Sequence, residues 1–265
     1  MSQVRVGVAT RLYSRPLVWG LLKGHHGDLL ETTQHPPSLL AQLMAQGSLD
    51  VALLSPLQAL ELDDVLLLPD LCAAADGPSE TIYLVSPQPF EDVRSVAVGA
   101  ENDAAAALLR IVYQEKFGFQ PQLHLQRPDL DRMLLSFDAA LLTGDAALRQ
   151  PTSAGQCLDL TAAWREITGL PWVFAVWVAQ ARVGLPDLPF YFKSSLRYGL
   201  SVMDSLVRES AAELDLSADR VREYLAEGQL GWVLRQREQQ SLEELYRRIV
   251  PLGFRDRGSA LSFGK

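Results

Sequence analysis

Several short polar segments in this chain directly follow apolar runs that are expected to form strands. In an open α/β sheet, ligands bind where the carboxyl ends of strands converge. The sequence therefore predicts a cleft for a small molecule that is lined by side chains from segments far apart in the chain. The candidate residues are Arg11, Tyr13, Ser14, Ser55, Ser86, Asn102, Thr143, Gly144 and Asp145.

Two arginines in the first polar segment, TRLYSRPL at residues 10–17, are candidates for contact with an anion. Arg11 lies in the loop after the first strand and is expected to reach the cleft. Arg15 precedes Pro16, and we expect it to pair with a carboxylate of the protein. Contact with an anionic ligand is the alternative, since a guanidinium binds a carboxylate of a ligand in the same way as a carboxylate of the protein.

The other candidates each have a structural alternative. Ser55 and Ser86 could cap a helix or bind a ligand. Asn102 begins a predicted helix at residues 102–118, whose free N–H groups would attract an anion, although its acidic neighbours weaken that attraction. Gly144 would let a ligand approach the backbone closely. Asp145 belongs either to the site or to the first turn of a helix.

Familiar catalytic and metal-binding motifs are missing from the sequence. No G-x-G-x-x-G, Walker or G-x-S-x-G motif is found, and the two cysteines are far apart. Of the four histidines, only His25 and His26 are adjacent, in a polar GHHG segment that is typical of a solvated turn. The sequence therefore predicts no metal site and no nucleophilic triad.

The pattern of apolar runs predicts an α/β fold with mostly parallel sheets. Strands are expected at residues 4–9, 28–33, 50–55 and 65–69, then at 81–86, 95–99 and 138–145, with helices between them. The longest apolar run, residues 170–179, is expected to form a central strand. From residue 189 the pattern is helical, with Ser217 and Ser241 as predicted N-caps. This order predicts one lobe from residues 1–86 and 178–265 and a second from residues 87–177.

The sequence argues against several classes of partner. The chain of 265 residues has a net charge of −8, with 32 acidic and 24 basic residues, and this balance argues against nucleic-acid binding. No apolar stretch reaches about 18 residues, so no membrane span is expected. The N-terminus lacks the basic and apolar regions of a secretory signal, and we expect a cytoplasmic protein. A small molecule is the expected partner. The sequence pattern does not specify how many copies of the chain assemble.

Five segments carry a resemblance to a known family. They are VGVATRLYSRPLVWGL, GSLDVALLSPLQAL, LLLPDLCAAADGPSETIYLVS, DAALLTGDAAL and TGLPWVFAVWVA. Together they are similar to the chorismate dehydratase (MqnA) family of the futalosine route to menaquinone. The resemblance implies a two-lobed, type II periplasmic-binding-protein-like fold with an interlobe cleft and a helical C-terminal region. It implies conversion of chorismate into 3-[(1-carboxyvinyl)oxy]benzoate, without a metal or redox cofactor.

The resemblance also implies roles for the candidate residues. Ser86 and Tyr13 are expected to be catalytic, and the other candidates are expected to bind the substrate. Two segments differ from the family pattern. Tyr13 stands where the family has an asparagine, and residues 101–105 replace a hydroxyl-rich stretch. Either Arg11 and Tyr13 take over the contacts with the anion, or the substrate or the activity has changed.

Two other functions are compatible with the same architecture. The first is a cytosolic protein that binds a small carboxylate without converting it. The second is the sister enzyme that makes dihydroxynaphthoate, which normally carries a catalytic histidine in the second lobe. His124 is the only histidine in that part of the sequence, and it lies within a predicted strand.

Overall fold

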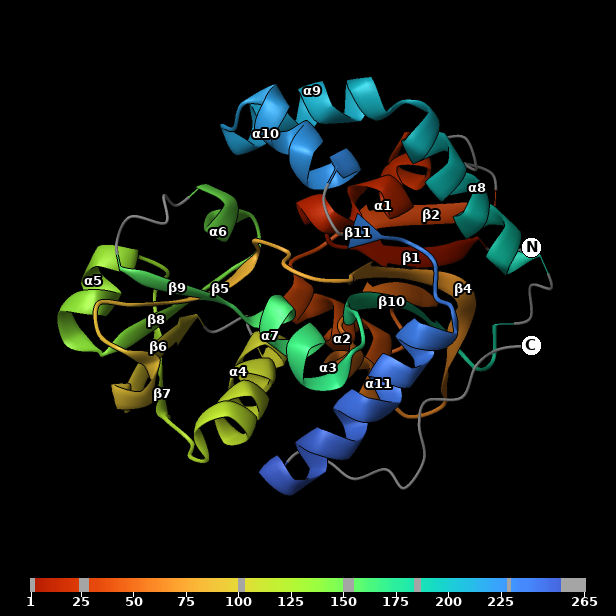
Figure 1. Ribbon diagram of the computed structural model, residues 1–265. Coiled ribbons are helices and arrows are strands. Elements are labelled where there is room, and N and C mark those ends of the chain that lie inside the picture. The colour runs from red at the N-terminus through yellow and green to blue at the C-terminus, as the bar shows by residue number, and fades with distance from the viewer. Residues whose placement is uncertain are drawn as a thin grey trace.

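The computed structural model describes residues 3–23, 29–99, 103–149, 155–183, 187–227 and 230–253. Its strands form two mixed β-sheets that lie side by side in Figure 1, each with helices packed against it. The chain builds most of the first sheet, passes into the second, and then returns to the first. This path agrees with the order expected from the sequence.

The first sheet has six strands in the order β11-β4-β10-β3-β1-β2. Their bounds are β1 (Val4–Val8), β2 (Leu30–Gln34), β3 (Val51–Leu54), β4 (Val65–Ala75), β10 (Trp172–Gln180) and β11 (Leu230–Gly231). Strand β1 is parallel to β2 and β3, whereas β10 is antiparallel to β3 and β4. The longest apolar run therefore forms a central strand, as predicted.

The second sheet has five strands in the order β7-β6-β8-β5-β9. Their bounds are β5 (Ile82–Ser86), β6 (Ser95–Gly99), β7 (Gln122–Gln126), β8 (Ala139–Thr143) and β9 (Gln156–Asp159). Strand β6 is parallel to β7 and β8, but β5 runs antiparallel to β8 and β9. Ile82, at the start of β5, therefore pairs with Thr143, at the end of β8.

The α-helices cover both sheets. Their bounds are α1 (Arg15–Leu22), α2 (Pro37–Ala45), α3 (Pro56–Leu60), α4 (Asp103–Phe117), α5 (Leu130–Ser136), α6 (Asp145–Arg149), α7 (Leu160–Thr168), α8 (Leu188–Ser201), α9 (Met203–Leu214), α10 (Ala218–Arg222) and α11 (Gln236–Ile249). A π-helical turn, η4 (Glu223–Glu227), follows α10, and 3₁₀ turns span η1 (Leu12–Ser14), η2 (Phe90–Asp92) and η5 (Val250–Leu252). The C-terminal region is thus mainly helical, as expected.

The predicted lobe boundaries fall close to the crossings between the sheets. Residues 76–81 connect β4 of the first sheet with β5 of the second, and residues 169–171 connect α7 with β10. The boundary at residues 86 and 87 lies at the end of β5, and the boundary at residues 177 and 178 lies within β10. The division of the chain into lobes at those residues stays a prediction.

Of the two predicted serine caps, one is confirmed and one is wrong. The Ser217 side chain accepts a hydrogen bond from the backbone N–H of Arg220 at the start of α10. Ser241 instead lies inside α11, which begins at Gln236, and its hydroxyl is buried. It donates to the carbonyl of Pro171 and accepts from the indole of Trp164. Ser241 therefore joins α11 to the segment that leads into β10.

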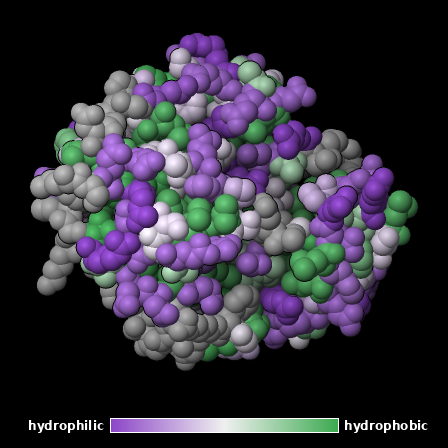
Figure 2. Space-filling model, turned by 180° about the vertical axis from the view of Figure 1, so that it is seen from behind, coloured by the Kyte–Doolittle hydropathy of each residue, from purple (hydrophilic) through white to green (hydrophobic). Residues whose placement is uncertain are grey.

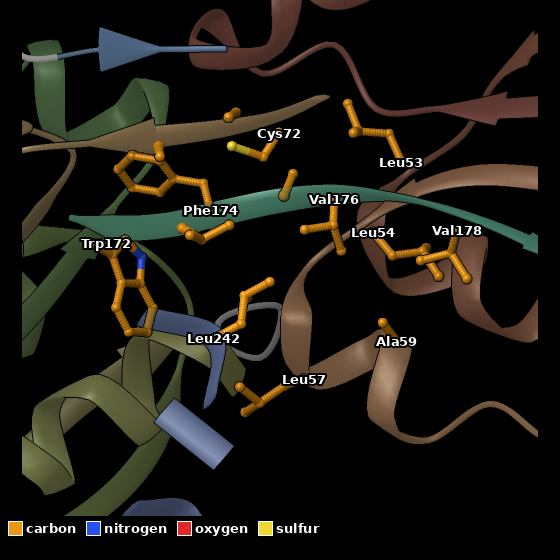
Figure 3. Packing of buried hydrophobic residues seen from close by; sticks show 14 of the residues in the cluster. Leu53, Leu54, Leu57, Ala59, Cys72, Trp172, Phe174, Val176, Val178 and Leu242 are labelled. Carbon is orange, nitrogen blue, oxygen red and sulfur yellow. The ribbon is translucent and has the colours of Figure 1, made fainter. Parts of the chain in front are cut away.

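The main hydrophobic core surrounds β10. Trp172, Phe174, Val176 and Val178 follow one another along this strand in Figure 3, with Leu242 of α11 and Leu57 of α3 packed against it. Burial of such large apolar side chains contributes most of the stabilisation of a fold of this kind. The core fixes β10, whose first residue, Trp172, pairs with Ala75 next to both crossing points of the chain.

Helix α1 is held against α8 by an unusually close contact. A Cβ atom added to Gly199 would lie 2.4 Å from the carbonyl oxygen of Pro16, and one added to Gly20 would lie 2.6 Å from the Cα atom of Ser195. The Ser195 hydroxyl donates to the carbonyl of Leu17 at 2.7 Å. This packing sets the position of the loop that precedes α1.

Arg15 has the structural role that its position predicted. The side chain is buried, with 1% of its surface exposed. It donates to the Ser210 hydroxyl at 2.9 Å and pairs with the Glu213 carboxylate at 2.9 Å, both on α9. Because a buried guanidinium needs such partners, Arg15 anchors the start of α1 to the C-terminal helices.

The described helices are too short or too polar to span a membrane. No helix in the described part of the chain is long and apolar enough to cross a bilayer. The face shown in Figure 2 mixes hydrophilic areas with smaller hydrophobic ones.

Asp50 is expected to contribute stability that depends on pH. Its carboxylate accepts hydrogen bonds from Arg5 at 2.9 Å and from Arg182 at 3.0 Å. Burial alone would raise the pKa of Asp50, but the bonds from Arg5 and the charges of both arginines outweigh it, and the pKa is lowered. The stabilisation is therefore complete above the unfolded-state pKa of about 4 and is lost as the pH falls through the folded-state pKa.

We expect Asp50→Asn to lower the free energy of unfolding at pH 7 by about 1 to 2 kcal/mol. The difference from the unchanged protein should shrink towards pH 3, because the unfolded-state carboxyl then binds a proton that the folded state, with its lowered pKa, resists. Urea unfolding at both pH values measures this, with Glu243→Gln on the exposed face of α11 as the control. A difference of equal size at both pH values would count against the assignment.

Candidate active site

A cavity lies between the two sheets, with residues from both in its wall. The volume of this cavity is about 120 Å³, which is enough to admit a small molecule. The lining residues are Ala9, Arg11, Tyr13, Ser14, Pro37, Leu53, Ser55, Gln58, Thr81, Ile82, Asp103, Ala104, Ala105, Thr143, Gly144, Trp172, Phe174 and Ala175. The structure therefore brings together the predicted segments around residues 11–14, 55 and 143–144.

One wall of the cavity is aromatic. The rings of Tyr13 and Phe174 are stacked, with centroids 4.9 Å apart and planes inclined by 18°. Burial raises the pKa of the Tyr13 phenol to about 12, against a smaller opposing effect of the Arg11 charge. Tyr13 is therefore neutral at pH 7 and can donate a hydrogen bond, beside the apolar ring of Phe174.

Arg11 supplies positive charge at the same wall. Its guanidinium lies close to Gly144, where an added Cβ atom would be 3.4 Å from Nη1. Gly144 has φ +62°, a conformation that favours glycine, and its N–H donates to the carbonyl of Thr81 at 2.7 Å. The backbone at this position thus leaves space for the arginine at the edge of the cavity.

The serines of the lining also have structural roles. Ser55 caps α3 through a capping box with Gln58, whose N–H donates to the serine hydroxyl at 3.2 Å. Ser14 is buried, and its hydroxyl lies 3.0 Å from the carbonyl oxygen of Ala9 and 2.9 Å from that of Arg11. Both side chains therefore hold the loops of the cavity in place.

Asp145 links the two halves of the site. Only 8% of its surface is exposed, and its carboxylate accepts a hydrogen bond from the backbone N–H of Leu12 at 3.0 Å. Burial raises the pKa of Asp145, although the Leu12 N–H and the Arg11 and Arg15 charges reduce the shift. Asp145 lies outside the cavity lining and joins α6 to the loop that carries Arg11 and Tyr13.

The expectation that Ser86 reaches the cleft is wrong. Ser86 is the last residue of β5, at the far end of the strand from Ile82 and the cavity, because β5 runs antiparallel to β8. Its hydroxyl is buried and lies 2.8 Å from the carbonyl oxygen of Gln88 and 3.0 Å from that of Asp138. The prediction assumed that β5 runs in the same direction as its neighbours. Asn102 lies outside the described residues.

Thr81 is a cavity residue that the sequence analysis missed. It lies just before the first residue of β5, and this end of the strand faces the cavity. Only 1% of the surface of Thr81 is exposed. Its hydroxyl is 3.0 Å from the Ser79 hydroxyl. No sequence pattern identified Thr81, because the start of β5 faces the cavity only as a result of the antiparallel pairing of β5 with β8.

Trp172 and Phe174 were missed for a different reason. They lie in the apolar run that the sequence analysis assigned to the core, and both are largely buried. The pairing of β10 with β4 shifts between Val173 and Ala175. This irregularity lies at Phe174, which stacks on Tyr13 in the cavity wall.

The histidines show no metal site in the described part of the chain. There, no group of three His, Cys, Asp or Glu side chains is arranged to hold a metal ion. The His124 ring in β7 stacks on Phe137, with centroids 4.8 Å apart. His25 and His26 lie outside the described residues.

Comparisons with known proteins agree with this architecture. The sequence pattern of a family described as Menaquinone biosynthesis matches residues 4–250. A curated relative from Thermus thermophilus, named Chorismate dehydratase, is 27% identical over 208 residues, which cover 71% of this chain and 76% of the relative.

Solved structures resemble the fold as well. Protein AF1704 from Archaeoglobus fulgidus superposes with a TM-score of 0.75 at 17% identity, covering 95% of this chain and 98% of the other. The periplasmic aliphatic sulphonate binding protein SsuA from Escherichia coli gives a TM-score of 0.63 at 16% identity, with 94% and 88% covered. The two-lobed, periplasmic-binding-protein-like fold predicted from the sequence is therefore confirmed.

Proposed function

Because the chain belongs to the menaquinone biosynthesis family, we propose that it is a chorismate dehydratase, a lyase that removes water from chorismate. One ring C–H bond and the neighbouring ring C–OH bond break, and a third ring double bond forms between those carbons. The proton and the hydroxide leave together as water. The product, 3-[(1-carboxyvinyl)oxy]benzoate, has an aromatic ring and keeps both carboxylates, so no electrons are transferred to or from a cofactor.

One observation carries this proposal. The cavity places the Arg11 guanidinium beside the stacked rings of Tyr13 and Phe174. A six-membered ring that bears carboxylates needs both features, since the flat wall accepts the ring and the guanidinium binds a carboxylate. Thr81, just before β5, and Thr143, at the end of β8, add residues with hydroxyl groups to the lining.

The lining residues then have distinct roles in the reaction. Arg11 binds a carboxylate and holds the ring against the aromatic wall, which reduces the entropic cost of orienting it. Tyr13, which stays protonated at neutral pH, donates a hydrogen bond to the departing hydroxyl. The ring becomes flat as it becomes aromatic, so the Tyr13–Phe174 surface fits the product-like transition state better than the bent substrate.

Turnover of chorismate tests the proposal. Purified protein is incubated with chorismate, and the aromatic product is followed by ultraviolet absorbance and identified by mass. We expect product in the presence of protein only. If chorismate instead raises the melting temperature without any product, the chain acts as a binding protein for small carboxylates. If neither effect is seen, both functions are rejected.

Replacing Tyr13 with phenylalanine separates its two roles. Tyr13→Phe keeps the stack on Phe174 but removes the hydroxyl, so we expect kcat for chorismate to fall about tenfold with KM nearly unchanged. Steady-state kinetics measures both constants. The melting temperature serves as the control for folding. Unchanged kcat would show that the Tyr13 hydroxyl takes no part in the reaction.

A further inference from the structure

The backbone of the turn that carries Tyr13 is bound by residues from both sheets. This turn is η1, and its N-cap, Arg11, makes no capping hydrogen bond through its side chain. A turn this short leaves N–H groups at its start and carbonyl groups at its end without partners inside the turn. The Leu12 N–H donates to Asp145, which follows β8, at 3.0 Å. The Tyr13 carbonyl accepts the indole N–H of Trp232, which follows β11, at 2.8 Å.

Trp232 is held in place by the first sheet. It directly follows β11, which pairs with β4. The carbonyl of Trp232 accepts the N–H of Cys72 in β4 at 3.3 Å. Two residues further on, the N–H of Leu234 donates to the carbonyl of Asp70 at 3.1 Å. The backbone is therefore fixed on both sides of Trp232, and the indole reaches Tyr13 from a rigid support.

The hydrogen bond from Trp232 gives this contact a direction that packing alone does not give. An indole has one N–H donor and no acceptor, so its single bond fixes where the Tyr13 carbonyl points. Both side chains also pack against the same two hydrophobic clusters. Trp232 is not among the residues that line the cavity. It therefore affects a bound ligand only through the residues that it holds.

The position of the Tyr13 hydroxyl depends on the backbone that Trp232 holds. The Tyr13 ring is stacked on Phe174, with centroids 4.9 Å apart. Stacking fixes the planes of two rings better than their offset, because several offset arrangements are similarly favourable. A group that takes part in a reaction must be placed to within about 0.5 Å. The bond from Trp232 restricts the offset by fixing the Tyr13 backbone.

We propose that Trp232 is a positioning residue, whose indole N–H holds the Tyr13 carbonyl and thereby places the Tyr13 hydroxyl next to the departing hydroxyl of the substrate. This inference rests on the proposed function, because it assumes that Tyr13 donates to that hydroxyl. It gives the segment after β11 a part in the reaction, although the described lining of the cavity contains no residue of that segment.

Kinetics of Trp232→Phe test the inference, at a temperature where every variant is folded. Phenylalanine keeps an aromatic ring but has no N–H, so we expect kcat for chorismate to fall about fivefold with KM nearly unchanged. Replacement of Trp232 by 3-benzothienylalanine, which keeps both fused rings and carries sulfur in place of the N–H, should give the same fall. Val233→Ala is the matched control. Its side chain belongs to the same segment but is exposed, so kcat should change less than about twofold.

A double-mutant cycle shows whether Trp232 acts through the Tyr13 hydroxyl. Adding Trp232→Phe to Tyr13→Phe should change kcat less than about twofold, because the hydroxyl that Trp232 places is then absent. A fall of the same size in both backgrounds would overturn the inference. Unchanged kcat in Trp232→Phe alone, with an active wild type, would overturn it too and leave the proposed function intact. An inactive wild type would reject the proposed function, and the inference with it.

Discussion

Arg11→Gln is expected to lower kcat/KM for chorismate about 100-fold. A hydrogen bond that involves a charged group contributes about 1.5 to 3 kcal/mol, and a guanidinium binds a carboxylate through two such bonds. Among the described lining residues, Arg11 is the only basic one. The loss should fall mainly on KM, because the carboxylate is bound in the substrate and in the transition state alike.

Two further variants make this result specific. Arg11→Lys keeps the charge but loses the two-pronged geometry, so its kcat/KM should lie between those of Arg11→Gln and the wild type. Arg127→Gln removes an exposed arginine after β7 and should change kcat/KM less than about twofold. Arg11→Gln with wild-type kcat/KM would show that Arg11 does not bind the substrate.

The second large effect is expected from Gly199→Ala, which should lower the free energy of unfolding by about 3 kcal/mol. The new methyl group would meet the backbone carbonyl of Pro16 at 2.4 Å, and backbone atoms cannot turn away as a flexible side chain can. Helices α1 and α8 would have to separate. Because α1 directly follows the loop with Arg11 and Tyr13, kcat/KM should fall as well.

Thermal unfolding measures the effect of this substitution. A loss of that size should lower the melting temperature by about 6 to 12 °C for a protein of this length. Gly231→Ala is the matched control, since an added Cβ atom there has no neighbour within 4 Å and the backbone is not left-handed. Equal melting temperatures for the two variants would contradict the close packing of α1 on α8.

Much of the fold could be predicted because hydrophobic patterns report burial directly. The run at residues 170–179 is apolar throughout, and β10 is buried on both faces between β4 and β3. Ser217 was recognised as a cap because it stands just before an apolar helical stripe. Ser241 has the same local pattern but lies inside α11, where its partners come from Trp164 and Pro171. Contacts between distant segments leave no local signal.

The site was predicted where it depends on local sequence and missed where it depends on strand pairing. Arg11 and Tyr13 follow β1 and Thr143 ends β8, both strands of the expected direction, and all three residues line the cavity. Ser86 ends β5, which runs the other way, so Thr81 just before that strand takes the place in the wall. The direction of a strand is set by its neighbours in the sheet, and a single sequence does not state it.

The central claim is that the cavity between the two sheets is where chorismate loses water. A structure of the protein with bound 3-[(1-carboxyvinyl)oxy]benzoate tests this most directly. We expect the benzoate ring against the stacked Tyr13 and Phe174 rings, with a carboxylate within hydrogen-bond distance of the Arg11 guanidinium. Product bound at any other surface, with this cavity filled by solvent alone, would contradict the account.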